Sequence, residues 1–236
     1  MSSPELPSTE SGTESTSAVP VVAIDGPSAS GKGTVAVLVA QGLGFHYLNS
    51  GALYRLVALA AAARNSDPES GALARIARDM RVRFEGEEIY LDERPVSAEI
   101  GTEQCAREAS RAAALPQVRA ALLDRQRAFR QPPGLVAEGR DMGTVVFPDG
   151  ALKVFLVASA EARAERRLKQ LKQKGIAATL PDLLRDLRER DARDAERAVA
   201  PLKPSPDAHW LDTTKLTAAQ AADCVLGWYR RDKRGG

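Results

Sequence analysis

The sequence has few residues of the kinds that hold metal ions or form disulfides. Of its 236 residues only two are cysteine and two are histidine. Cys105 and Cys224 lie too far apart in sequence for a metal knuckle or a redox pair, so we interpret both as free thiols in a reducing cytoplasm. His46 and His209 are also far apart in sequence, so we do not expect a histidine-based metal site.

Long apolar runs and a strong charge of either sign are also missing. No stretch reaches the roughly 18 apolar residues that a membrane-spanning helix needs. The 33 basic residues nearly balance the 31 acidic ones, for a net charge of +2, so neither a nucleic acid nor a membrane is expected as a partner. Residues 1–18 are rich in Ser, Thr, Pro and Glu, with neither a basic start nor an apolar core. We expect them to form a disordered tail.

The rest of the chain, residues 19–236, alternates short apolar runs with helical patterns. With 44% apolar residues the whole chain can build one sizeable core. Helices are expected from about Lys32 to Leu43, where Gly44 is a stop signal, and over residues 50–65. The alternation predicts an α/β fold of three layers, in which helices flank a five-stranded parallel sheet. The predicted strands are residues 21–25, 45–49, 134–139, 151–159 and, more weakly, 209–214.

One segment interrupts the alternation. Within an insert of about residues 70–108, VRF and IYL flank a glycine-containing turn in the pattern of a β-hairpin. The helical stretch after it contains Pro116, which predicts a kink or a break. The charge-dense stretch from residue 159 to residue 197 is typical of a pair of solvated helices laced with ion pairs.

The strongest motif is GPSASGK at residues 26–32, which matches G-x-x-x-x-G-K between a predicted strand and a predicted helix. Glycines let the backbone approach closely, and N–H groups of the loop and of the helix N-terminus hold phosphate oxygens, while Lys32 adds a mobile charge. The G-x-G-x-x-G of a dinucleotide fold is not present. A glycine-rich turn with an incidental lysine is the alternative. The predicted triphosphate site comprises Gly26, Pro27, Ser28, Ala29, Ser30, Gly31, Lys32, Gly33 and Thr34.

Gly33 stands where the general P-loop pattern has Ser or Thr. The form G-K-G-T is that of nucleoside monophosphate kinases, and three further segments resemble bacterial cytidylate kinases: NSGALYR (49–55), AEGRDMGTVVFP (137–148) and RDARDAERAVAPL (190–202). The resemblance runs in order and with similar spacing from about Val21 to the C-terminal helix. It implies a monomeric cytoplasmic enzyme that uses ATP and Mg²⁺ to convert CMP or dCMP into CDP or dCDP, with the insert as the monophosphate-binding subdomain.

The resemblance also assigns an acceptor site. Arg190, Asp194 and Arg197 are spaced i, i+4 and i+7, so we expect them on one face of a helix, although spacing alone fits an ion-paired solvated stripe equally well. In the family that face contacts the ribose and the base or phosphates. The remaining expected contacts are Ser50, Arg55 and Arg140 with the acceptor phosphate, and Ser110, Arg119 and Asp141 with the cytosine edge.

A lid over about residues 163–190 is expected on the donor side. Arg163 and Arg167 precede KQLKQKG, which resembles the short lid that closes over ATP, and Arg167 is the one expected to contact the transferred phosphate. The attacking phosphate oxygen is already ionised near neutral pH, so catalysis requires positioning and charge neutralisation rather than a general base. The expected catalytic residues are Lys32, Arg140, Arg167 and Arg197.

The sequence does not identify the Mg²⁺ ligands. Gly33 lacks the hydroxyl that Ser or Thr supplies after the lysine of the loop, and Thr34 can contact a phosphate instead. Two positions depart from the family pattern: Asn49 stands where Asp is expected, and Gly101 where the insert carries Arg. Two other functions remain alternatives. One is another P-loop kinase, acting on UMP, AMP or a sugar acid. The other is a non-catalytic ATP-binding switch, which would have no acceptor pocket.

Overall fold

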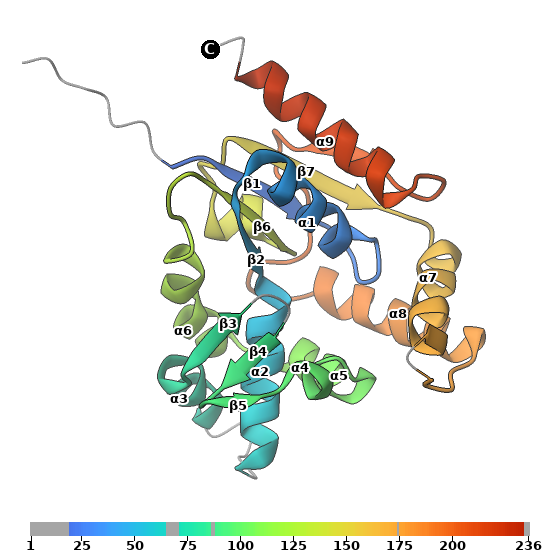
Figure 1. Cartoon of the computed structure of the whole chain (residues 1–236). Coiled ribbons are helices and arrows are strands. Elements are labelled where there is room, and N and C mark those ends of the chain that lie inside the picture. Colours follow the sequence, from blue (N-terminus) through green and yellow to red (C-terminus); the bar gives the residue numbers. More distant parts are fainter. Residues whose placement is uncertain (1–18, 65–70, 86–87, 174, 234–236) are drawn as a thin grey trace, which may run out of the picture.

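The computed structural model describes residues 19–64, 71–85, 88–173 and 175–233. The predicted tail at residues 1–18 lies outside these ranges. A five-stranded parallel sheet in the order β2-β6-β1-β7-β8 forms the centre of the molecule (Figure 1), which confirms the predicted sheet. Its strands are β1 (Val21–Asp25), β2 (His46–Asn49), β6 (Leu135–Gly139), β7 (Leu152–Val157) and β8 (His209–Asp212).

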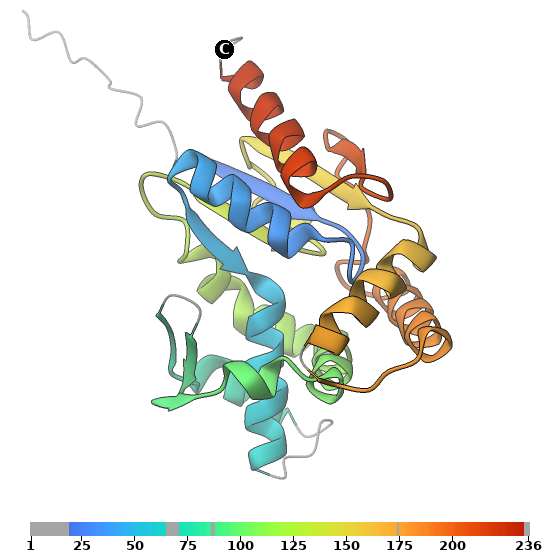
Figure 2. The ribbon, with the colours of Figure 1, turned by 45° about the vertical axis from the view of Figure 1, so that its right-hand side comes forward.

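Helices cover both faces of this sheet, as three layers require. Helices α1 (Lys32–Leu43) and α9 (Ala218–Asp232) lie side by side on one face in both views (Figure 1, Figure 2). The other face is covered by α2 (Ser50–Ala63) and by η1 (Met142–Val146), a short π-helix. Alternate residues of β1 belong to the two apolar clusters: Val22 and Ile24 face α1 and α9, while Val21 and Ala23 face α2. The unbroken apolar run of β1 is therefore explained by burial on both faces.

The insert contains a three-stranded antiparallel sheet in the order β3-β4-β5. The predicted hairpin is present, with Val82 opposite Leu91 and Phe84 opposite Ile89. The third strand was not predicted, because two residues are too few to show a strand pattern. The elements of the insert are α3 (Ala72–Asp79), β3 (Val82–Glu85), β4 (Glu88–Leu91), β5 (Arg94–Pro95), α4 (Ser97–Ile100) and α5 (Glu103–Ala112).

Pro116 breaks the helical stretch after the insert, as predicted. It begins α6 (Pro116–Arg127), where a residue without an N–H fits because the first turn has no acceptor for it. The charge-dense stretch forms two helices, α7 (Ala160–Gln173) and α8 (Leu180–Ala195).

The predicted helix face through Arg190, Asp194 and Arg197 was wrong at its last member. Helix α8 ends at Ala195, so Arg197 lies beyond it. The helix ends because the chain turns back after it. The Asp194 carbonyl oxygen accepts a hydrogen bond from the Leu202 N–H at 2.7 Å, in place of the N–H four residues further on that would continue the helix.

Candidate active site

A cavity of about 470 Å³ opens at the carboxyl ends of β2 and β6, between the loop after β1, the insert and helices α7 and α8. Ligands of open parallel sheets bind at such an edge. Most of the predicted site residues line this cavity although they come from distant parts of the chain. They are Ser28, Ala29, Lys32, Gly33, Ser50, Arg55, Ser110, Arg119, Arg140, Asp141, Arg167, Arg190, Asp194 and Arg197.

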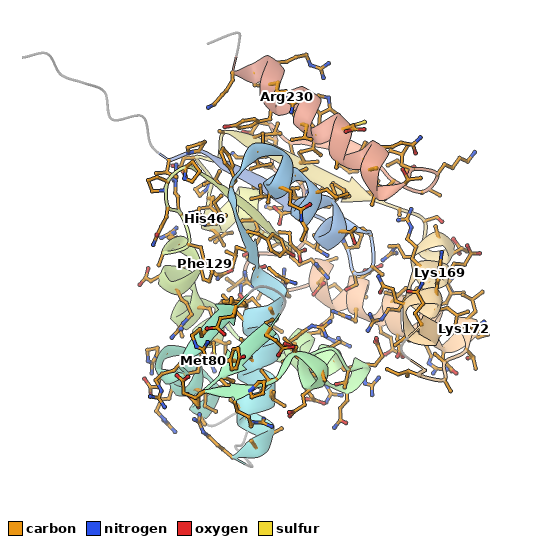
Figure 3. The ribbon with its side chains drawn as sticks, viewed as in Figure 1. His46, Met80, Phe129, Lys169, Lys172 and Arg230 are labelled. Atoms are coloured by element: carbon orange, nitrogen blue, oxygen red, sulfur yellow. The ribbon has the colours of Figure 1, made fainter. Side chains whose placement is uncertain are left out.

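A second cavity of about 380 Å³ lies on the other side of the same loop. Residues of the loop from Ala29 to Thr34 line it, together with Thr213 and Leu216 after β8. Lys169, labelled with Lys172 on α7 in Figure 3, also lines it. Because Lys32 and Gly33 border both cavities, the loop is placed to contact two ligands at once.

Gly26 and Pro27, which were also predicted for the triphosphate site, line neither cavity. A Cβ atom on Gly26 would overlap the Leu156 carbonyl, so only glycine lets the loop pass this close to β7. The Pro27 carbonyl oxygen accepts a hydrogen bond from Lys32 Nζ at 3.2 Å.

Lys32 is folded back on its own loop. Its Nζ lies 3.8 Å from Glu138 Oε2. Burial and, after it, the charge of Arg140 together lower the pKa of Lys32 to about 7, although the carboxylate of Glu138 acts to raise it. A bound triphosphate reverses this balance, because a nearby anion favours the charged amine.

Arg140 joins the loop to α8 across the first cavity. Its Nη2 donates to Ser28 Oγ at 2.7 Å and its Nε donates to Asp194 Oδ2 at 2.8 Å. Burial works to raise the pKa of Asp194, but Arg140 and the neighbouring arginines more than offset it and hold that pKa below its usual value. Arg140 and Asp194 thus form an ion pair in the wall of the first cavity.

A carboxylate, a guanidinium and a hydroxyl, all on buried residues, line the inner end of the cavity. Asp141 and Arg119 form a buried ion pair, and burial raises the pKa of Asp141 despite that partner. The guanidinium carbon of Arg119 lies 5.8 Å from the centre of the Tyr54 ring. Ser110 Oγ accepts a hydrogen bond from Arg193 Nη1 at 2.9 Å. Donors and acceptors of this kind can read the edge of a base.

Ser50 and Arg55 extend from α2 toward the same cavity. Ser50 Oγ donates to the Glu138 carbonyl oxygen at 2.8 Å, and Arg55 Nη1 donates to the Ile100 carbonyl oxygen. Asn49, one of the two departures, caps α2 by accepting the Ala52 N–H at 3.1 Å. Asparagine therefore keeps the capping function that aspartate would have and lacks only its charge.

The two arginines that were predicted to belong to a lid differ in position. Arg163 lies beneath the loop, where its Nη1 donates to the Ser28 carbonyl oxygen at 3.3 Å and lies 2.6 Å from Asp191 Oδ2. Arg167 lines the cavity, as its predicted role requires, and its Nε donates to Glu103 Oε1 at 2.5 Å. This ion pair connects α7 with α5 across the cavity.

Glu138 is the carboxylate best placed to approach a metal ion at the loop. Within the described ranges no group of three or more His, Cys, Asp or Glu side chains could hold a metal ion. Glu138 is buried and lines both cavities, and its Oε1 would lie 3.5 Å from a Cβ atom on Gly33. One carboxylate together with phosphates and waters is a usual Mg²⁺ environment, so the residues present fit that ion.

Sequence reasoning missed three residues that shape the site. Glu138 carried a signal, since it lies inside AEGRDMG at the end of a predicted strand. Arg193 and Arg166 carried no signal in the sequence, because each forms its hydrogen bonds with residues that are distant in sequence. Arg166 Nη1 donates to the Ser30 carbonyl oxygen and to Thr213 Oγ1, both at 3.2 Å.

Comparison with known proteins gives one family over nearly the whole chain. The sequence model of the family described as cytidylate kinase matches residues 22–231. The cytidylate kinase of Bordetella bronchiseptica is 60% identical over 92% of this chain and 97% of its own length. That of Bordetella pertussis is 59% identical over 91% and 97%, and that of Paraburkholderia phymatum is 58% identical over 89% and 93%.

Proposed function

The chain belongs to the cytidylate kinase family, and from this premise we propose that its first cavity holds CMP and its second holds ATP. The enzyme transfers the γ-phosphoryl group of ATP to CMP or dCMP and yields ADP with CDP or dCDP. The observation that carries the assignment of the site is that residues from positions 28 to 197 converge on one cavity beside the phosphate loop.

The phosphate end of the site works by charge. A phosphate oxygen of CMP attacks the γ-phosphorus while the bond to the β-phosphate oxygen of ADP breaks, and the cations line up the two anions. Lys32 neutralises the donor phosphates from the loop, and Arg55 and Arg190 hold the acceptor phosphate. Burial and the charge of Arg140 lower the pKa of Arg190 to about 10, which still leaves it charged at neutral pH. Arg140 lies between the loop and α8, where donor and acceptor phosphates meet.

The base end of the site selects the pyrimidine. Asp141 and Ser110 accept from the exocyclic amine of cytosine, and Arg119 donates to the ring acceptors. Uracil presents an oxygen in place of that amine, so its carbonyl faces a carboxylate and stays unpaired. An unsatisfied buried group costs roughly 1 to 3 kcal/mol, or about a 5-fold to 150-fold preference for CMP over UMP.

Mg²⁺ supplies charge neutralisation for the phosphates when it is bound. We assign Glu138 as the residue that holds it, directly or through water, because its carboxylate borders the loop on both sides. Arg167 belongs to the closing lid, which excludes water from the transferred phosphate. Arg197 completes the acceptor side from the turn beyond α8.

We propose a monomeric enzyme of the cytoplasm whose partners are these small molecules and not nucleic acids. Among the described residues no helix is long and apolar enough to cross a membrane. The net charge of +2 gives the molecule no overall field that would attract a polyanion.

A coupled assay of ADP release over CMP, dCMP, UMP and AMP tests the function. We expect CMP and dCMP to be preferred, UMP to be disfavoured within the range above, and AMP to react least because a purine overfills the inner end. Asp141→Ala should raise the KM for CMP and narrow the gap to UMP, with the KM for ATP unchanged. Release of ADP that no monophosphate accelerates would indicate a nucleotide switch instead.

A further inference from the structure

The strand that leads into the phosphate loop ends in a carboxylate with no part in the reaction above. Val21 and Ala23 of β1 pack in the apolar cluster beneath α2, and by the alternation of a strand Asp25 lies on the same face. Its side chain is buried, with a 5% exposed residue surface. Because burying a carboxylate is costly unless it accepts hydrogen bonds, its partners indicate what it does.

Both oxygens of Asp25 accept hydrogen bonds from the start of η1. Oδ1 accepts the Met142 N–H and Oδ2 accepts the Gly143 N–H, each at 2.8 Å. The first N–H groups of a helix have no acceptor within it. Strand β1 supplies that acceptor from the neighbouring layer, so the carboxylate ties η1 to the strand that precedes the loop.

These hydrogen bonds fix one end of a two-residue segment whose other end is fixed in the sheet. Arg140 and Asp141 are the only residues between Gly139, the last residue of β6, and Met142. Gly139 lies opposite Asp25 in the β1–β6 register. Both ends of the segment are therefore set by the same point of β1.

We propose that Asp25 is a positioning residue for the acceptor nucleotide, and that it orients Arg140 and Asp141 through the Met142 and Gly143 backbone. Asp25 lines neither cavity, so it acts only through this segment. Asp141 then faces Arg119 at the base end, and Arg140 reaches Ser28 of the loop. The inference rests on the proposed function, because it assigns these two side chains to CMP.

Asp25→Asn tests the proposal with little change of shape. The amide offers one oxygen as an acceptor and turns an NH₂ group toward the other backbone N–H. We expect the KM for CMP to rise about tenfold and the CMP-over-UMP preference to fall at least roughly threefold, since one of the two hydrogen bonds to the η1 backbone is lost. The KM for ATP should stay within about twofold. Asp149→Asn is the matched control, because this exposed aspartate pairs with Arg130. It should leave the KM for CMP, the CMP-over-UMP preference and the KM for ATP unchanged.

A purely structural role predicts a different result. It lowers the melting temperature and the kcat while both KM values and the CMP-over-UMP ratio stay at the parent values, and that outcome overturns the proposal. If Asp25→Asn does not fold, amide hydrogen exchange of the parent enzyme tests the proposal instead. Met142 and Gly143 should be protected in the empty enzyme as strongly as the β6 amides, and loop-like exchange overturns the proposal. Failure of the parent to phosphorylate CMP would instead refute the proposed function, before any variant is compared.

Discussion

A methyl group added at Gly139 should damage the acceptor site from inside the sheet. A Cβ atom there would lie 2.5 Å from Ser50 Oγ and 2.9 Å from Met142 Cε, and Met142 is fully buried. Overpacking of this kind costs about 1 to 3 kcal/mol. Displacing Ser50 from the Glu138 carbonyl oxygen costs about 1 kcal/mol more. The expected loss for Gly139→Ala is therefore about 2 to 4 kcal/mol of unfolding free energy.

Two assays follow from this estimate. At about 2 to 4 °C per kcal/mol for a protein of this size, the melting temperature should fall by about 4 to 16 °C. Because Ser50 moves, the KM for CMP should rise on the order of tenfold, since small displacements of positioning groups are costly. The KM for ATP should not change, because the donor contacts come from the other side of the loop.

Gly134→Ala is the matched control, because Gly134 directly precedes the opposite end of the same strand. A Cβ atom there would lie 2.5 Å from the Phe45 ring, so the clash is similar but lies away from both cavities. It should lower the melting temperature without changing either KM. Equal KM values for CMP in the two variants, or a melting temperature of Gly139→Ala equal to that of the parent, would contradict the expected displacement of Ser50.

Three further predictions concern groups that burial has perturbed. Lys32→Ala should keep its melting temperature and lower kcat/KM for ATP by a factor on the order of 10² to 10³; a loss of only a few fold would show that the loop is not the donor site. Burial lowers the pKa of Lys32 to about 7, so its amine is mostly neutral at pH 8 in the empty enzyme. ATP binding at pH 8 should therefore add about one proton to this amine, because the bound phosphates favour its charged form. Calorimetry in buffers of different ionisation enthalpy measures this uptake, and uptake that persists in Lys32→Ala contradicts the assignment. Burial raises the pKa of Asp25 from 3.8 to about 7, so the stability contributed by its neutral form is greatest below the unfolded value and is lost as the pH rises through 7. The melting temperature of the parent minus that of Asp25→Asn should accordingly shrink between pH 5 and pH 8, and a difference that grows with pH would refute this sign.

The features predictable from the sequence are those that neighbouring residues determine. The parallel sheet follows from short apolar runs such as residues 21–25, and the loop follows from glycines and Lys32 at fixed spacing between a strand and a helix. Pro116 begins a helix after a break, because a residue without an N–H donor fits the first turn of a helix but not its interior. Each of these signals is contained within a few residues, so no knowledge of distant contacts was needed.

Features that depend on distant contacts were not predictable. Helical spacing placed Arg197 on α8, whereas the hydrogen bond from Leu202 to Asp194 ends that helix. The ion pair of Arg167 with Glu103 joins two elements separated by 64 positions in the sequence, and no local pattern shows it. Asp25 did carry a signal, as a carboxylate that closes an otherwise apolar strand, but its partners in η1 appear only when the layers pack.

The ion pair between Arg167 and Glu103 gives the empty enzyme a built-in counter-ion. In the proposed reaction the phosphate that reaches Arg167 replaces one anion with another, so the charge around this side chain is nearly the same before and after binding. Before ADP and CDP leave, the carboxylate of Glu103 can return to the guanidinium and compete with the phosphates bound there. Such competition favours product release, which limits turnover in many enzymes that close a lid over their substrates.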